Sequence, residues 1–155
     1  MTEEGRTRMI PAFDPATGYL PPGQHDATWN DIVATYAYTP HRRAILAGLR
    51  AALDNLANAG CRRVYLNGSF VTTKLVPGDY DLCYDPAGID SKTLDRIIAA
   101  TGRSRHILQL AKYRGDLVPS TAVADLTRTQ YVHFFQKDEN GTPKGILVVD
   151  LGSDT

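Results

Sequence analysis

The chain has 155 residues, a length that suits one domain with a single hydrophobic core. Its 17 basic residues balance 17 acidic ones, and 43% of the residues are hydrophobic while 22% are charged. This composition is typical of a soluble globular protein. It excludes an argument from overall charge for binding to a nucleic acid or to an anionic membrane.

The two cysteines, Cys61 and Cys83, form neither a disulfide framework nor a paired metal-binding motif. No apolar run approaches the roughly 20 residues that cross a bilayer, and the N-terminus lacks the apolar segment of a secretory signal. We therefore expect a cytoplasmic protein, without a membrane partner, whose thiols are reduced and partly buried.

Residues 1–39 are expected to form an irregular arm, and residues 40–155 are expected to form one folded domain. The arm contains the stretch "PAFDPATGYLPPGQHDATWNDI", whose prolines and glycines resist regular structure. Its aromatic residues Phe13 and Trp29 are expected to anchor the arm by packing on the domain surface.

A helix is expected from Pro40 to just before Gly60. Thr39 can cap this helix, proline suits the first helical position, and glycine can end it. The apolar residues of the helix fall on one stripe at three- and four-residue spacing: Ile45, Leu46, Leu49, Leu53 and Leu56.

The segments that follow are expected to alternate between strands and a helix. A short buried strand is predicted for "RRVYLNG", an alternating strand for "DYDLCYD", and a helix from Asp90 or Ser91 to Gly102. The stretch "HILQLAKYRGDLVPS" fits either a helix followed by a short strand or one longer strand. The segment "YVHFFQKDENGTPKGILVVDL" is predicted to form two strands around the turn at Asn140-Gly141.

Two aspartates lie on one face of the predicted strand "DYDLCYD". Because side chains alternate along a strand, Asp79 and Asp81 lie about 7 Å apart at the backbone, whereas Tyr80 and Leu82 point to the core. Such carboxylates repel each other unless a cation lies between them. Mg²⁺ or Mn²⁺ would make the pair favourable, since hard cations prefer carboxylate and phosphate oxygens. The structural alternatives are a turn position for Asp79 and a solvated strand position for Asp81.

A Gly-Ser turn stands shortly before the paired aspartates in the sequence. Gly68 lets the backbone approach a phosphate closely, Ser69 adds a hydroxyl donor, and Lys74 can reach a phosphate as a point charge. Together with the aspartates, these residues predict a site for phosphate and metal on neighbouring strands.

The order of these residues resembles the signature of the DNA polymerase beta-like nucleotidyltransferase superfamily. The resemblance rests on "LNGSF" followed by "PGDYDLCYD", which supply an apolar residue, Gly-Ser, a gap and then Asp-x-Asp. It covers residues 40–116. The stretch "GYLPPG" and the ending "FFQKDENGTPKGILVVDL" also resemble a bacterial group of small, uncharacterised nucleotidyltransferase-like proteins.

The resemblance implies an α+β nucleotidyltransferase fold, in which helices flank a mixed sheet and the two aspartates hold a divalent metal against a nucleoside triphosphate. It also implies a third acid on a later strand, which binds metal and acts as a general base. Asp116 in "YRGDLVPS" stands at the expected place in chain order, and Asp150 in "ILVVDLG" is the alternative. An exposed position at a strand end is the structural alternative for both residues.

Several basic residues precede or flank Asp116. They are candidates for binding the triphosphate or an acceptor phosphate, and a solvated surface is the equal alternative. These residues are Arg103, Arg105, His106, Lys112 and Arg114.

The resemblance therefore predicts a magnesium-dependent nucleotidyltransferase that moves a nucleoside monophosphate from ATP, GTP, CTP or UTP to a hydroxyl group of RNA or of a protein. Minimal members of the superfamily suggest a toxin or an antitoxin with a cognate partner. The N-terminal arm would then either bind this partner or form a dimer. The main alternative is an inactive interaction or regulatory subunit with the same fold.

Overall fold

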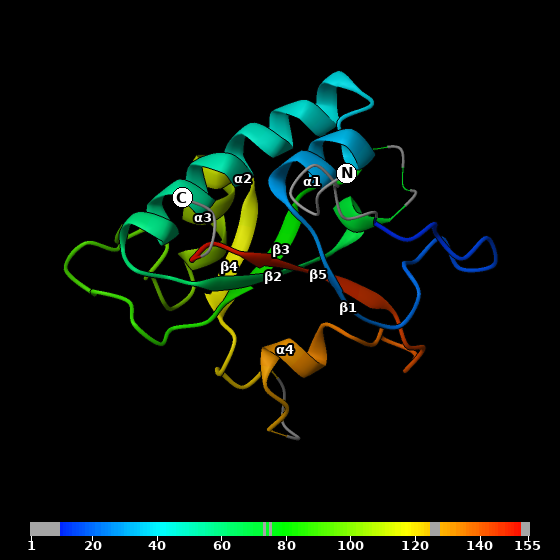
Figure 1. Cartoon of the computed structure of the whole chain (residues 1–155). Helices are drawn as coiled ribbons and strands as arrows, with labels where there is room; N and C mark the ends of the chain where they lie inside the picture. The colour runs from blue at the N-terminus through cyan, green and yellow to red at the C-terminus, as the bar shows by residue number, and fades with distance from the viewer. Residues whose placement is uncertain (1–9, 73, 75, 125–127, 153–155) are drawn as a thin grey trace, which may run out of the picture.

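The computed structural model describes residues 10–72, 74, 76–124 and 128–152. Within this part of the chain, four α-helices and a five-stranded mixed sheet form an α/β fold (Figure 1). The strands lie in the order β1 (Gly23–Asp26), β5 (Gly145–Asp150), β2 (Arg63–Asn67), β3 (Tyr80–Tyr84) and β4 (Gly115–Pro119). The helices are α1 (Trp29–Tyr36), α2 (Pro40–Asn58), α3 (Arg105–Tyr113) and α4 (Tyr131–Phe134), and a 3₁₀ helix, η2 (Ser69–Val71), follows β2.

The directions of the strands bring the Gly-Ser turn to the start of β3. β1 runs parallel to β5, while β2 runs antiparallel to both of its neighbours, β5 and β3. β4 runs parallel to β3. The end of β2 and the beginnings of β3 and β4 therefore lie side by side, at the same end of the three strands.

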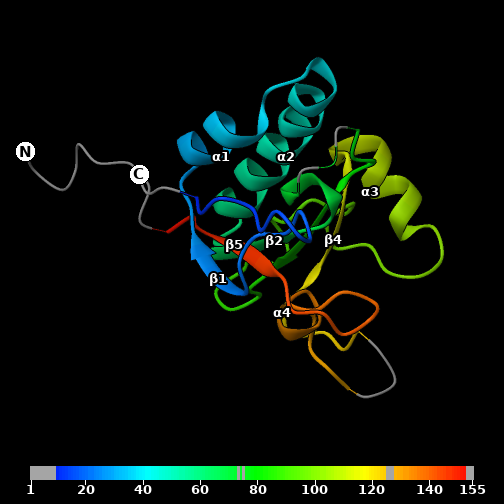
Figure 2. The same ribbon diagram turned by 90° about the vertical axis from the view of Figure 1, so that its right-hand side faces the viewer.

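Helix α2 forms where the sequence predicts it and covers one face of the sheet. The Thr39 hydroxyl accepts a hydrogen bond from the Arg42 amide at 3.0 Å, and Pro40 occupies the first turn. The predicted apolar stripe is buried and packs in one cluster with the side chains of Tyr80 and Leu82, which point from β3 to this face as expected. Figures 1 and 2 show α1 and α2 together on this side.

The other face of the sheet carries a smaller apolar cluster, with α4 beneath it (Figure 2). Its buried members are Cys83, Val118, Phe135 and Ile146. Cys83 lies two residues after Asp81 and on the same face. Apolar side chains therefore cover the aspartate face toward the end of β3. Polar side chains lie on this face near the start of the strand.

The prediction of an irregular arm is wrong for residues 23–36, which contain β1 and α1, whereas residues 10–22 have turns and irregular backbone as expected. β1 pairs with β5, so that Gly23 lies opposite Gly145, and α1 packs beside α2 (Figure 2). The sequence "GQHD" has low strand propensity, and the strand forms because β5 offers it an edge to pair with. Phe13 and Trp29 pack against the core, as expected.

Thr28 begins α1 with a capping box. Its hydroxyl accepts from the Asp31 amide at 3.1 Å, and the Asp31 carboxylate accepts from the Thr28 amide at 3.0 Å. We expect Thr28→Ala to lower the free energy of unfolding by about 1 kcal/mol, because an amide at the helix start loses its acceptor. Urea denaturation measures this change. The control is Thr101→Ala, at an exposed threonine outside the helices, and an equal loss in both variants would contradict the capping role.

The helix predicted for residues 90–102 is wrong, because this segment forms a series of turns. Leu94 and Ile98 are buried, as the helical spacing suggested. However, the side-chain amide of Gln109 donates to the carbonyl groups of Ile97 and Ile98 at 3.0 and 3.2 Å. A side chain of α3 thus satisfies backbone groups that a helix would pair internally.

The two remaining predictions concern the C-terminal half. The ambiguous stretch at 106–120 is a helix followed by a strand, α3 and β4. Of the two strands predicted for the last segment, β5 is confirmed, but residues 131–134 form the short helix α4 instead. The turn at Asn140-Gly141 is present, with Gly141 at a φ of 81°.

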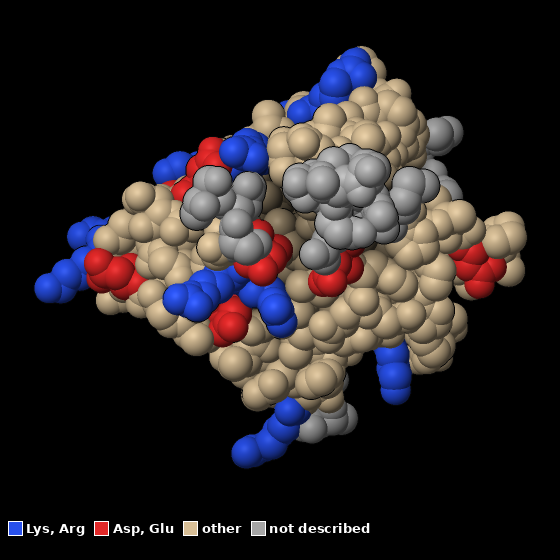
Figure 3. Space-filling view, in the orientation of Figure 1, with Lys and Arg blue, Asp and Glu red and all other residues tan. Residues whose placement is uncertain are grey.

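No helix within the described ranges has the length and apolar content needed to cross a bilayer. On the face shown in Figure 3, acidic and basic side chains lie next to one another rather than in a patch of one sign. The balance of charge in the composition therefore also holds locally on this face.

Candidate functional site

Three polar side chains form a row across β2, β3 and β4. Asn67 lies opposite Asp81 in the antiparallel pair, and Asp81 lies beside Asp116 in the parallel pair. Residues paired in this way place their side chains on the same face of a sheet. The fold thus brings two carboxylates from distant parts of the sequence together.

The Gly-Ser turn packs directly against this row. Gly68 has a φ of 93°, in the left-handed region, and a Cβ atom there would lie 3.0 Å from Oδ2 of Asp81 and 3.1 Å from its amide nitrogen. Only glycine combines this backbone conformation with so close an approach to the carboxylate. Ser69 begins η2. Its side chain lies outside the part of the chain that the structure describes, so the predicted hydroxyl donor stays a prediction.

Asp79, the other member of the predicted aspartate pair, stands one residue before β3 and is half-buried. Burial raises its pKa, and the charge of Asp116 raises it further. The pKa of Asp81 is raised to about 6, first by burial and then by the charges of Asp79 and Asp116. Asp79 and Asp81 are therefore buried acids that also lie within electrostatic reach of Asp116.

Asp116 is held by two side chains at the start of α3. The guanidinium group of Arg105 donates to Oδ1 of Asp116 at 2.5 Å, and Nδ1 of His106 lies 3.3 Å from the same oxygen. Arg105 also donates to Oε1 of Gln109 at 3.0 Å, which fixes its position. One carboxylate oxygen of Asp116 is thus occupied by protein donors.

Basic side chains from different elements lie near the carboxylates. Lys74, in the connection between β2 and β3, and His106 oppose the rise in the pKa of Asp79. Lys144, just before β5, opposes the rise in the pKa of Asp81. Lys74 therefore lies within electrostatic reach of Asp79, and its contact with a phosphate stays a prediction.

Sequence reasoning missed Lys144. The pairing of Leu66 with Leu147, continued past the ends of β2 and β5, places Lys144 next to the Gly-Ser turn. Lys144 precedes Ile146 by two residues, so both point to the face that carries the aspartates. The sequence carried no signal for this contact, because it depends on which strand β5 joins.

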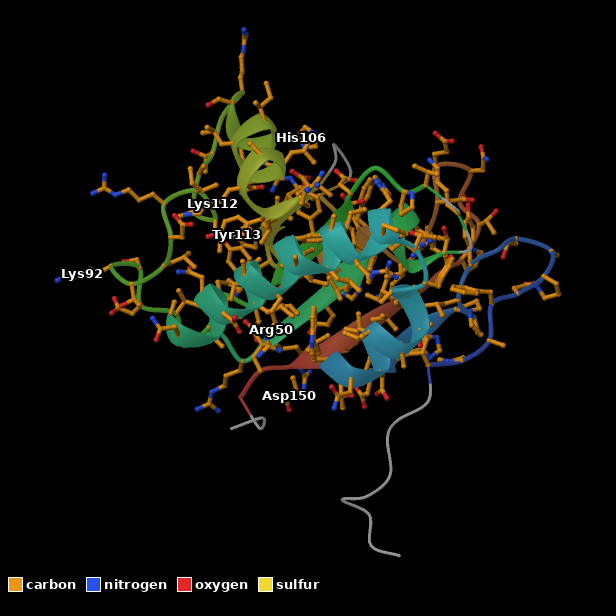
Figure 4. All side chains as sticks on the ribbon, turned by 90° about the horizontal axis from the view of Figure 1, so that it is seen from above. Arg50, Lys92, His106, Lys112, Tyr113 and Asp150 are labelled. Carbon is orange, nitrogen blue, oxygen red and sulfur yellow. The ribbon has the colours of Figure 1, made fainter. Side chains whose placement is uncertain are left out.

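Asp150 does not belong to this site. It lies opposite Arg63, at the other end of β2 from Asn67, and it is exposed. Figure 4 shows Asp150 on the opposite side of the molecule from His106. Of the two candidates for the third carboxylate, the fold brings Asp116 to the other aspartates and leaves Asp150 apart.

Two other basic candidates, Lys112 and Arg114, have their contacts elsewhere. Lys112 forms an ion pair with Asp95 at 2.6 Å, on the outer side of α3 (Figure 4). Arg114 ends α3 in the left-handed conformation, with a φ of 64°, and its side chain packs beside Gly48 of α2. Among the described candidates with a defined contact, Arg105 and His106 are the ones at the carboxylates.

The donor chemistry of the site suits a hard divalent cation. The side-chain oxygen of Asn67 is buried beside Asp81 and has no hydrogen-bond partner among the described residues. A buried acceptor without a donor is costly, and a cation or its bound water would satisfy it. Burial first and the neighbouring carboxylates second raise the pKa values of Asp79 and Asp81, and a cation would stabilise the charged form of both groups.

The side chains are not preassembled around such a cation. Among the residues that the structure describes, no three His, Cys, Asp or Glu side chains are grouped closely enough to hold a metal ion. One carboxylate oxygen of Asp116 is instead engaged by Arg105. Binding of one cation by all three carboxylates would therefore require their side chains to rearrange.

Comparisons with known proteins give a family but no activity. No curated protein and no solved structure matched the chain. A family model described as a family of unknown function, DUF6932, matches residues 11–150. The match includes β1, the Gly-Ser turn, the three aspartates and β5. The chain therefore belongs to the DUF6932 family.

Proposed function

We propose that this protein binds a nucleoside triphosphate with a divalent cation and transfers its nucleotidyl group to a hydroxyl acceptor. The observation that carries the proposal is the pairing of Asp81 with Asp116 on adjacent strands, directly beside the left-handed turn at Gly68. This arrangement joins acidic ligands to a backbone that a phosphate can approach closely.

Each part of the site has a defined task in this proposal. Asp79 and Asp81 would hold Mg²⁺ or Mn²⁺, which when bound neutralises phosphate charge. The backbone at Gly68 would contact the phosphates, and Lys74 and Lys144 would attract them from two sides. We also propose that the mixed sheet and its helices form a nucleotidyltransferase fold, as the resemblance of the sequence implies.

The transfer itself needs positioning more than covalent chemistry. The acceptor oxygen attacks the α-phosphorus, the bond from that phosphorus to the bridging oxygen of the β-phosphate breaks, and pyrophosphate leaves. The carboxylate of Asp116, once turned away from Arg105, accepts the proton of the hydroxyl group. The acceptor class that we propose is a hydroxyl group of RNA or of a protein, in a bacterial toxin–antitoxin pair.

One observation favours a second function, an inactive nucleotidyltransferase-like subunit. The Arg105–Asp116 ion pair at 2.5 Å occupies the carboxylate that would accept the proton. A protein that keeps this pair on binding nucleotide would hold the nucleotide without transfer. The two functions differ in pyrophosphate release and not in binding.

The proposal is tested by calorimetric titration with ATP, GTP, CTP and UTP, each with and without Mg²⁺. We expect the wild type to bind one of them only when Mg²⁺ is present. The variant Asp79→Asn/Asp81→Asn should lose this binding, because amides replace both charged ligands. The matched control is Asp150→Asn, which removes a carboxylate at the far end of the sheet and should bind as the wild type does.

The outcomes separate the candidates. Metal-dependent binding together with pyrophosphate release in the presence of an RNA or protein acceptor supports transfer. Metal-dependent binding without pyrophosphate release, whichever acceptor is added, supports the inactive subunit. No binding by the folded wild type, or equal binding by the double variant, refutes a nucleotide site at these aspartates.

A further inference from the structure

A fully buried arginine holds the connection that follows the Gly-Ser turn. Arg42 in the first turn of α2 is 0% exposed. Its Nη1 atom donates to the carbonyl oxygen of Phe70 at 2.8 Å, and its Nη2 atom donates to that of Thr72 at 3.0 Å and to that of Lys74. One guanidinium group thus binds three carbonyl groups within five consecutive residues of this connection.

The neighbouring residue on α2 holds the same connection further along. The Nε2 atom of His41 lies 2.5 Å from the carbonyl oxygen of Pro77. The start of α2 therefore contacts the connection both after the Gly-Ser turn and just before Asp79. The helix, itself anchored in the core, serves as a rigid support for both halves of the candidate site.

In the described part of the chain, aromatic rings and carbonyl groups rather than carboxylates surround the guanidinium group of Arg42. Within the described residues, no ion pair joins Arg42 to a carboxylate. Its guanidinium carbon lies 4.6 Å from the ring centre of Tyr38 and 5.3 Å from that of Phe70. Burying an arginine without a carboxylate is costly, and an apolar side chain would fill the same space at lower cost. The carbonyl hydrogen bonds are the feature that an apolar residue could not supply.

We propose that Arg42 is a positioning residue, which fixes the connection after Gly68 in the orientation that binds phosphate groups. It acts through the backbone, since it contacts carbonyl groups on the α2 side while Gly68 faces Asp81 on the other. The buried positive charge behind the connection also favours an anion in front of it. This inference rests on the proposed function for the identity of the ligand. Cation binding by Asp79 and Asp81 does not depend on it.

The test compares the wild type with Arg42→Met, Arg42→Lys and a matched control, Arg43→Met. Arg43 lies on the same helical turn, is exposed, and donates to the carbonyl of Ala37 outside the connection. The probes are Mn²⁺ alone and tripolyphosphate with Mg²⁺, both by calorimetry. Hydrogen exchange of peptides that contain residues 69–72 gives a readout that needs no ligand.

We expect Arg42→Met to weaken tripolyphosphate binding by at least about tenfold while the Kd for Mn²⁺ stays within about twofold of the wild type. Exchange of the 69–72 peptides should accelerate, whereas exchange of α2 and β5 should not. Arg42→Lys keeps the charge and some of the hydrogen bonds, so its affinity for tripolyphosphate should lie between those of the wild type and Arg42→Met. It provides the test if Arg42→Met does not fold.

Each result is decisive. Equal tripolyphosphate affinity in Arg42→Met, or an equal loss of both Mn²⁺ and tripolyphosphate binding, would overturn the positioning role. A wild type that binds neither tripolyphosphate nor any of the four nucleoside triphosphates would refute the proposed function instead. Hydrogen exchange then decides on Arg42 alone, since unchanged exchange of the 69–72 peptides would show that the arginine does not hold this backbone.

Discussion

In the absence of divalent cations, Asp81→Asn is expected to be more stable than the wild type by on the order of 2–3 kcal/mol at about pH 8. The pKa of Asp81 is raised from 3.8 to about 6 in the folded protein, chiefly by burial. The unfolded chain therefore loses this proton more readily than the folded chain. Stability falls as the pH rises from below 3.8 through about 6, and it stays lower above that range.

Asparagine carries no titrating proton, so the advantage of the variant should shrink as the pH falls to about 4. Urea denaturation in the presence of a chelator, across this pH range, measures the difference. Asp54→Asn is the control, because Asp54 is exposed and its ion pair with Arg50 is a surface pair. If Asp81→Asn is less stable than the wild type at high pH, its carboxylate is already neutralised by protein groups. That result would weaken the case for a cation site.

Gly115→Ala is expected to lower the free energy of unfolding by about 1–3 kcal/mol, the usual cost of overpacking a core. A Cβ atom at this position would lie 2.3 Å from Cζ and 2.4 Å from Cε1 of Tyr80. The Tyr80 ring is fully buried and cannot move aside cheaply. β4 must therefore shift relative to β3, and Asp116, the next residue, would move away from Asp81.

Two measurements check this expectation, urea denaturation and Mg²⁺-dependent nucleotide binding, and both should weaken. Gly78→Ala is the matched control, since a Cβ atom there meets no other atom within 4 Å. A Gly115→Ala variant that retains the stability and the binding of the wild type would show that the β3–β4 contact is more plastic than its packing indicates.

The parts of the fold that the sequence predicted are those with strong local patterns. Helix α2 has a cap, a proline at its start and an unbroken apolar stripe, and β3 has clear alternation. The segment at 90–102 has apolar residues at helical spacing too, yet tertiary partners decide its structure. Besides the bonds from Gln109, the side-chain oxygen of Asn55 accepts from the Asp95 amide at 2.9 Å. Such long-range acceptors leave no trace in a local pattern.

The same distinction applies to the candidate site. Asp79, Asp81 and Gly68 lie close together in the sequence, so a short motif could indicate them. Asp116 followed from chain order, and its place beside Asp81 depends on the parallel pairing of β3 and β4. Lys144 could not be weighed in the same way, because its position depends on which strand β5 joins.

The order of strands has a consequence for how the chain folds during translation. β5 lies between β1 and β2, although it is made after both. In the described part of the chain, β1 pairs with β5 and with no other strand. Until residues 145–150 have left the ribosome, β1 therefore has no strand to join, while β2, β3 and β4 can already assemble. Closure of the sheet is thus a late, long-range event, and such events are slow compared with local folding. A nascent chain halted before Gly145 would expose the edge of β2 and leave a template for unwanted strand pairing.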